Sequence, residues 1–236
     1  MPLKDQSVLV VGASSGIGRE TALLFAREGA RVMAAARRED RLKALQTEAA
    51  GIEIAVADAS IAGDMQRLGD AARERFGKID IMVYATGTNT PDRAMSRLTP
   101  AIWDTLINAN LNGAYYITQA VLPHMRSAGA GHLIYISSIS AIVPDVSGAA
   151  YQASKRGLLG LAHAVRVEEK EHGIRTCVVC PGLVETEILA KRPVQPSAEI
   201  LAKALQPVDI AEIVVSVARL PARASVPELQ IMPTYL

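Results

Sequence analysis

The chain has 236 residues, of which 50% are hydrophobic and 21% charged, with 25 Lys and Arg against 24 Asp and Glu. This length suits one large domain or two small ones, and the apolar content allows a sizeable core to be buried. The balanced charge gives no reason to expect nucleic acid or a membrane surface as a partner. No apolar run reaches the ~20 residues that cross a bilayer, and residues 1–6 lack the apolar stretch of a signal peptide, so we expect a cytoplasmic protein.

Short apolar runs alternate with longer helical patterns along the chain. The predicted strands are 7–11, 31–36, 52–57, 79–85, 132–137, 175–180 and 228–232, and the predicted helices are 16–28, 40–50, 62–76, 101–126, 151–171 and 208–219. Pro123 should kink the fourth helix or end it early. The alternation predicts an α/β fold in a single domain over residues 1–236: a Rossmann-type doubly wound parallel sheet of about seven strands with helices on both faces.

A glycine-rich turn follows the first predicted strand. Gly12 allows the tight turn, Gly16 lets backbone approach a pyrophosphate, and Gly18 lets the next helix pack against the sheet. The helix N-terminus favours the phosphate charge. A plain strand-to-helix turn is the alternative, but the position at the first strand–helix junction favours a dinucleotide site. The loop residues expected to join the glycines in this site are Ser14, Ser15 and Ile17.

The end of the second strand predicts which dinucleotide is bound. An acidic residue there would bind the ribose 2′-hydroxyl of NAD, whereas an arginine would accept the 2′-phosphate of NADP. The chain has Arg37 and Arg38 at this place, and Asp40 comes too late. A solvated basic turn is the alternative. Arg37, helped by Ser14, is well placed for charge-assisted hydrogen bonds to phosphate, so we expect NADP (NADPH) rather than NAD.

Two serines lie at the carboxyl end of a predicted strand, where a doubly wound sheet binds its ligands. Ser137 and Ser138 close the fifth strand, and either hydroxyl can hold a substrate oxygen, although a turn-forming Ser is the alternative. Asn108 and Asn110 lie within the fourth predicted helix, where Asn is unfavourable. Their presence there indicates a functional role for one of the two.

Tyr151 and Lys155 lie four residues apart on a predicted helix and share one face. A phenol of pKa ~10 is a poor acid–base catalyst near neutrality. A nearby ammonium and the positive ring of an oxidised nicotinamide favour the phenolate and lower that pKa. An ordinary helix face with an exposed Tyr and Lys is the alternative.

Cys177 and Cys180 form a C-x-x-C within a predicted strand, where residues three apart point to opposite faces. We interpret them as two separate core cysteines rather than a redox pair. The four histidines show no metal-ligand spacing, so no metal site is expected.

Together these patterns resemble the short-chain dehydrogenase/reductase family over nearly the whole chain. The glycine loop has the spacing G-x-x-x-G-x-G, with Val11 where the family usually has Thr, and residues 151–155 match Y-x-x-x-K. The resemblance selects Ser138, thirteen residues before Tyr151, and implies the catalytic tetrad Asn110, Ser138, Tyr151 and Lys155. In this tetrad Ser138 orients the substrate oxygen, Tyr151 is the general acid–base, Lys155 lowers its pKa and binds the nicotinamide ribose, and Asn110 supports a water chain to the lysine.

The resemblance also implies further cofactor contacts. Asp58 would meet the adenine and Thr186 the nicotinamide carboxamide; the other expected contacts are Ala59, Ala85, Gly87, Pro181, Gly182 and Val184. The family's N-N-A-G after strand four reads Tyr-Ala-Thr-Gly at residues 84–87, and Tyr84 is not expected to replace the Asn that braces the sheet.

The expected reaction is hydride transfer between nicotinamide and a small carbonyl or alcohol. The substrate pocket would be lined by Thr88, Ile139, Val143, Gln152 and Leu183, under a short flap over residues 187–206. Residues 226–234 resemble the endings of 3-hydroxy acid, serine and clavulanate-type dehydrogenases, which suggests a hydroxy acid; Arg93 and Arg192 are guesses for its cationic anchor. The alternatives are a 3-oxoacyl-carrier-protein-type reductase and a non-catalytic NADP-sensing relative. By the same resemblance the fourth and fifth helices pair across a twofold axis, giving a homodimer or homotetramer.

Overall fold

A computed structural model describes residues 3–235. One parallel sheet forms its centre, with the strand order β3-β2-β1-β4-β5-β6-β7. The strands are β1 (Ser7–Val11), β2 (Arg31–Ala36), β3 (Ile52–Val56), β4 (Ile81–Tyr84), β5 (Gly131–Ile136), β6 (Ile174–Pro181) and β7 (Glu228–Ile231). The order reverses between β1 and β4, which is the switch point of a doubly wound sheet. The predicted fold class is confirmed.

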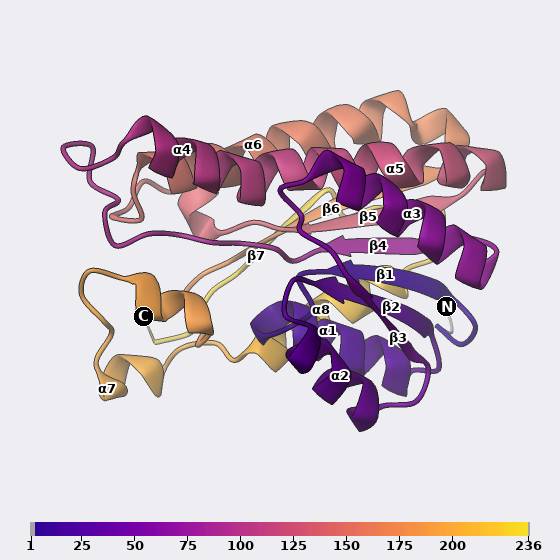
Figure 1. Cartoon of the computed structure of the whole chain (residues 1–236), viewed down its shortest axis with the longest axis horizontal. Helices are drawn as coiled ribbons and strands as arrows, with labels where there is room; N and C mark the ends of the chain where they lie inside the picture. The colour runs from indigo at the N-terminus through magenta and orange to yellow at the C-terminus, as the bar shows by residue number, and fades with distance from the viewer. Residues whose placement is uncertain (1–2, 236) are drawn as a thin grey trace.

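Helices cover both faces of the sheet (Figure 1). One face carries α1 (Gly16–Arg27), α2 (Glu39–Glu48) and α8 (Pro207–Ala218), and the other carries α3 (Ala62–Phe76), α4 (Pro100–Ile107), α5 (Gly113–Ala128) and α6 (Ala149–Glu168). Each face has its own apolar core, because successive strand residues point to opposite sides: Val8 and Val10 belong to one core, Leu9 and Val11 to the other.

The two cysteines follow the same rule. Cys177 and Cys180 are free, buried in β6 and divided between the two cores. Burial raises the pKa of the Cys177 thiol to about 12 and that of Cys180 to about 11. The prediction of separate core cysteines is therefore confirmed, and neither is poised for thiolate chemistry.

The fourth predicted helix is divided into three parts. α4 ends at Ile107, a π-helical turn, η1 (Asn108–Asn112), follows, and α5 continues to Ala128. α5 continues past Pro123 to Ala128, so of the two outcomes expected for Pro123 the early end of the helix is wrong. Pro123 and Gln119, whose carbonyl loses its usual donor, are both exposed, so water can replace the missing hydrogen bond. The buried side chains of Val121, Leu122 and Met125 hold the helix on the core.

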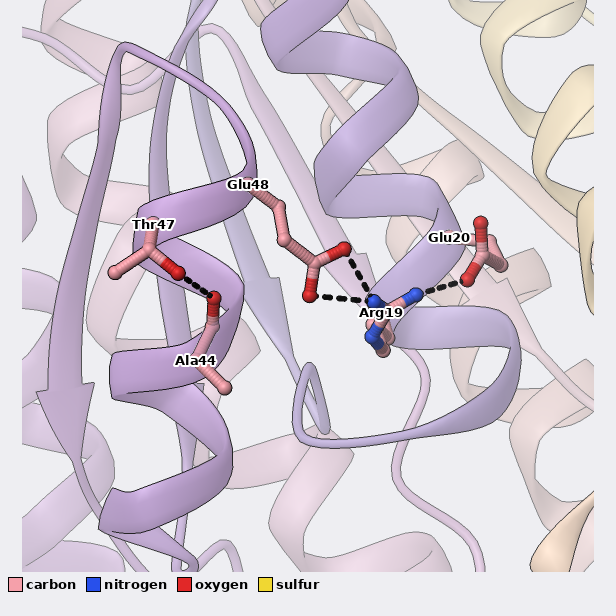
Figure 2. Close-up of polar contacts among 5 residues, drawn as sticks. All are labelled: Arg19, Glu20, Ala44, Thr47 and Glu48. Carbon is pink, nitrogen blue, oxygen red and sulfur yellow. Dashed lines mark hydrogen bonds and ion pairs between the residues drawn. The ribbon is translucent and has the colours of Figure 1, made fainter.

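On the opposite face, a charged surface contact joins α1 to α2 (Figure 2). Arg19 Nη2 donates to both carboxylate oxygens of Glu48, at 2.6 and 2.5 Å, and Nη1 donates to Glu20. Thr47 Oγ1 donates to the Ala44 carbonyl within α2 at 2.7 Å. Exposed pairs of this kind contribute at most ~1 kcal/mol. The contact therefore joins the surfaces of α1 and α2 but adds little to the stability of the fold.

Candidate active site

A cleft of about 810 Å³ opens at the carboxyl ends of the strands, where doubly wound sheets bind ligands. All of the predicted site residues line it except Gly18 and Asn110, which are buried in its wall. Of the expected substrate-pocket residues, Thr88, Ile139 and Leu183 line the cleft. Val143 and Gln152 do not, because Val143 points to solvent with 52% of its surface exposed and Gln152 donates to the Asp145 carbonyl.

The glycine loop forms one end of the cleft. The backbone N–H groups of Gly12 and Ala13 donate to the Ala35 carbonyl of β2, at 2.8 and 3.1 Å, which turns the loop over the sheet. A Cβ at Gly18 would lie 2.3 Å from the Gly12 carbonyl oxygen, so only glycine lets α1 begin this close beneath the loop. The side chain of Ser15, the N-cap residue of α1, makes no capping hydrogen bond. Loop and helix start thus form a backbone cradle suited to a pyrophosphate.

Two arginines follow β2, and their positions differ from the prediction. Arg38, not Arg37, contacts the loop: its Nη2 donates to Ser14 Oγ at 3.0 Å and to Ser15 Oγ at 2.7 Å, and its Nη1 donates to Glu187 at 2.8 Å. Arg37 turns to the other side, 3.6 Å from the Asp58 carboxylate, and is 73% exposed. Adjacent residues that leave a strand point in opposite directions, so the basic group beside Ser14 is Arg38.

Tyr84 ends β4 at the place where the sequence departs from the family pattern. Its side chain is fully buried, and its hydroxyl donates to the Ala109 carbonyl of η1 at 2.5 Å. Burial raises the pKa of this phenol well above its usual range. Contrary to expectation, Tyr84 therefore does brace β4, by holding it against the π turn.

That π turn positions Asn110, which is completely buried. Its Oδ1 accepts from the Thr88 N–H at 2.8 Å, and its Nδ2 donates to the Thr88 carbonyl and to Ser154 Oγ, both at 3.0 Å. Asn110 thus joins the segment after β4 to α6. Its side chain makes no direct hydrogen bond to Lys155.

The two serines after β5 have different partners. Ser137 Oγ donates to the Lys155 carbonyl at 2.8 Å and so holds α6 in place. Ser138 Oγ faces the cleft and donates to Ser140 Oγ at 3.1 Å, and Ser140 Oγ donates in turn to the Asp145 carboxylate at 2.6 Å. This chain of hydroxyls orients Ser138 and was not predicted, although Ser138 and Ser140 share one side of the chain by their spacing.

Tyr151 and Lys155 project from the first turns of α6 into the cleft. Burial raises the pKa of Tyr151, and the hydrogen bond with Ser138 and the charges of Arg192 and Arg93 oppose that rise. Burial lowers the pKa of Lys155 to about 8, and its Nζ donates to the Ile136 carbonyl at 3.0 Å. Lys155 Nζ lies 5.9 Å from the centre of the Tyr151 ring. Ser138 and the two arginines thus favour the phenolate and Asp145 disfavours it, while the effect expected of Lys155 on the pKa of Tyr151 stays a prediction.

Between residues 3 and 235 we find no helix both long and apolar enough to pass through a membrane.

Comparisons with known proteins agree with this geometry. The short chain dehydrogenase family matches residues 6–196. The 3-oxoacyl-[acyl-carrier-protein] reductase FabG of Thermotoga maritima is 33% identical over 82% of this chain and 80% of its own length. Among solved structures, serine dehydrogenase complexed with NADP+ superimposes with a TM-score of 0.90 at 30% identity, over 97% of this chain and 95% of that one. A metagenomic short-chain oxidoreductase in complex with NADP gives a TM-score of 0.86 at 30% identity, over 100% of both chains. The chain therefore belongs to the short-chain dehydrogenase family.

Proposed function

We propose that this protein is an NADP-dependent oxidoreductase that interconverts a small alcohol and its carbonyl compound. The observation that carries the proposal is the gathering of Ser138, Tyr151 and Lys155 at one end of a cleft whose other end is a glycine cradle covered by Arg38. Two similar structures, serine dehydrogenase and the metagenomic oxidoreductase, contain NADP.

The residues that would hold the cofactor fit its parts. The Gly12–Gly18 loop and the start of α1 would bind the pyrophosphate, and Arg38 with Ser14 and Ser15 would bind the 2′-phosphate. Asp58, Thr186 and Lys155 line the same cleft; Asp58 would contact the adenine, and Thr186 and Lys155 would contact the nicotinamide part. When bound, the nicotinamide would supply or accept the hydride.

The side chains around the reacting carbon would handle the proton. Ser138 Oγ would donate a hydrogen bond to the substrate oxygen once its proton turns away from Ser140 Oγ, and the Ser140 N–H, which donates to Ser138 Oγ at 3.2 Å, would keep that oxygen in place. In the direction of reduction, Tyr151 would give its phenolic proton to that oxygen. Lys155, whose pKa of about 8 lies near neutrality, would then return a proton toward the phenolate. Asn110 would keep the wall rigid through Thr88 and Ser154.

The test is a titration of the purified full-length protein with NADPH and with NADH, followed by the fluorescence of the reduced nicotinamide. We expect tight NADPH binding and weaker NADH binding, after which a panel of carbonyl compounds is screened for NADPH oxidation. A preference for NADH would overturn the choice of cofactor but not the reaction. Binding of neither would overturn the proposal.

A second candidate is a 3-oxoacyl-carrier-protein reductase, favoured by the 33% identity to the Thermotoga maritima enzyme. Reduction of 3-oxoacyl thioesters, with no reduction of small oxo compounds, would select it. Binding of NADPH without turnover of any carbonyl compound would instead favour a non-catalytic, cofactor-sensing relative.

We also propose that the chain forms a homodimer or homotetramer through α4, α5 and α6. Large apolar side chains are exposed on each of these helices: Trp103 at 38%, Tyr115 at 47% and Val167 at 57%. A monomeric mass in light scattering would contradict this proposal.

A further inference from the structure

We propose that the substrate carries a carboxylate and that Arg93 and Arg192, with Lys191, form the site that binds it. This inference rests on the proposed function, because it assigns the part of the cleft beside Tyr151 to the substrate. All three cations line the cleft.

Arg93 is held against the start of the catalytic helix. Gly148 is the N-cap of α6 and has a φ of 92°, and a Cβ there would lie 2.6 Å from Arg93 Cβ and 2.7 Å from the Arg93 carbonyl oxygen. The neighbouring Asn89 Nδ2 donates to the Ser147 carbonyl at 3.1 Å. Gly148, three residues before Tyr151, thus leaves room for Arg93 to pack against the start of α6. The hydrogen bond from Asn89 to Ser147 holds the segment that contains Arg93 in this position.

The guanidinium of Arg93 is buried and oriented. Only 8% of the residue is exposed. Its Nε donates to the Thr90 carbonyl at 3.0 Å and its Nη2 to the Lys191 carbonyl at 2.7 Å, which leaves Nη1 outside both bonds. The bond to Lys191 joins the segment after β4 to η4 (Glu187–Lys191), so that Arg192 follows directly. Arg93 and Arg192 are close enough to Tyr151 for both charges to favour its phenolate.

The charges at this end of the cleft do not balance. Within residues 3–235, no carboxylate lies within ion-pair distance of Arg93, Arg192 or Lys191, and the Lys191 ammonium donates instead to Thr88 Oγ1 at 2.6 Å. The one carboxylate lining this end among those residues is Asp145, which already accepts from Ser140 Oγ at 2.6 Å and from Ser147 Oγ at 3.0 Å. Three cations and one anion leave an excess of two positive charges.

The Asp145 charge opposes the fall that burial and the Arg192 charge cause in the pKa of Arg93, but it does so without an ion pair at contact distance. A buried guanidinium with no carboxylate in contact is unfavourable, and an arginine fork matches a carboxylate closely. An anion bound by Arg93 would lie in the same cleft as Tyr151 and Ser138. The substrate class that this arrangement fits is a small hydroxy acid, or the corresponding oxo acid.

The experiment uses the full-length Tyr151→Phe protein saturated with NADPH, so that binding is measured without turnover. Small 2-, 3- and 4-oxo acids of three to six carbons, and the matched amides, are titrated by calorimetry. We expect at least one acid to bind ~10-fold or more tightly than its amide. In the same background, Arg93→Met and Arg192→Met should each remove most of that preference. Arg97→Met should leave it unchanged, because Arg97 lies in the same segment but is exposed and paired with Asp92.

Melting curves show whether Arg93→Met is folded; Arg192→Met provides the test should it fail to fold. Equal binding of every acid and its amide, or a preference that survives both arginine variants, overturns the inference. Tighter binding of a matched phosphate monoester overturns the assignment to a carboxylate. Wild-type turnover is measured in parallel: oxidation of NADPH by neutral ketones but not by acids contradicts the inference alone. Preferential acid binding without any turnover contradicts only the proposed reaction.

Discussion

The arginines at the two ends of the cleft differ in whether a carboxylate pairs with them. At the cofactor end, each arginine has a carboxylate within ion-pair distance: Arg37 lies beside Asp58 and Arg38 beside Glu187. At the substrate end, Arg93 and Arg192 have no such partner within residues 3–235. The cofactor end is otherwise built from backbone and glycine, whereas the substrate end is built from side chains held by hydrogen bonds to carbonyls.

This difference separates two kinds of recognition. A pyrophosphate can be bound by N–H groups and a helix dipole alone, so the cofactor end can keep its side-chain charges balanced. The 2′-phosphate would then compete with Glu187 for Arg38. At the substrate end, the proposed basis of selection is instead the excess positive charge of side chains, which would favour an anion.

Gly18→Ala tests whether the cofactor end depends on close backbone packing. The new Cβ would meet the Gly12 carbonyl oxygen at 2.3 Å, so the loop must move. We expect a loss of stability of about 1–3 kcal/mol and loss of measurable NADPH binding, in melting curves and fluorescence titrations. Gly63→Ala in α3 is the matched control, because its added Cβ would meet only the end of the flexible Arg67 side chain, at 3.4 Å from Nη1. A Gly18→Ala protein that melts and binds like the wild type would refute the cradle.

Arg38→Ala tests which arginine selects the phosphate. A charged hydrogen bond contributes ~1.5–3 kcal/mol, so the Kd for NADPH should rise about 10-fold or more, with little change for NADH. Arg37→Ala should have a smaller effect, because Arg37 faces Asp58 and is 73% exposed. A larger loss in Arg37→Ala would restore the assignment made from sequence.

Tyr84→Phe tests the wall between the two ends. The change removes the donor to the buried Ala109 carbonyl, which should lower the free energy of unfolding by about 1–3 kcal/mol. The matched control is Tyr115→Phe, whose residue is 47% exposed and should change stability little. Equal melting temperatures for Tyr84→Phe and the wild type would show that the bond has no bracing role.

His132 lies outside the cleft and should affect stability alone. Burial, with the nearby Arg175 charge, lowers its pKa from 6.5 to about 3. Between about pH 6.5 and pH 3, His132 is protonated in the unfolded chain but stays neutral in the folded protein. The free energy of unfolding therefore falls as the pH is lowered through this range. The largest slope is ~1.4 kcal/mol per pH unit. His132→Phe should flatten this slope in urea titrations. An unchanged slope in His132→Phe would count against a neutral buried His132.

The parts of the site that depend on local sequence patterns could be predicted from the sequence. The glycine spacing, the strand ends and the four-residue separation of Tyr151 and Lys155 place their groups without knowledge of distant contacts. The sequence predicted Arg37 beside Ser14, whereas the structure has Arg38 there. The difference arises because neighbouring residues in extended backbone point in opposite directions, so an error of one residue reverses the side chain. The support that Tyr84 receives from Ala109, and the burial of Arg93 against Gly148, depend on segments far apart in the chain. No local pattern predicts them.

We propose that Tyr151 transfers a proton in an NADPH-dependent reduction. The most direct test is single-turnover absorbance of the wild-type and Tyr151→Phe proteins, each loaded with NADPH and mixed with a panel of oxo acids. We predict that the wild type consumes NADPH with at least one acid. Tyr151→Phe should bind NADPH as tightly but react ~100-fold or more slowly, since general acid catalysis contributes about 10²–10⁴-fold. Equal rates in the two proteins would contradict the account.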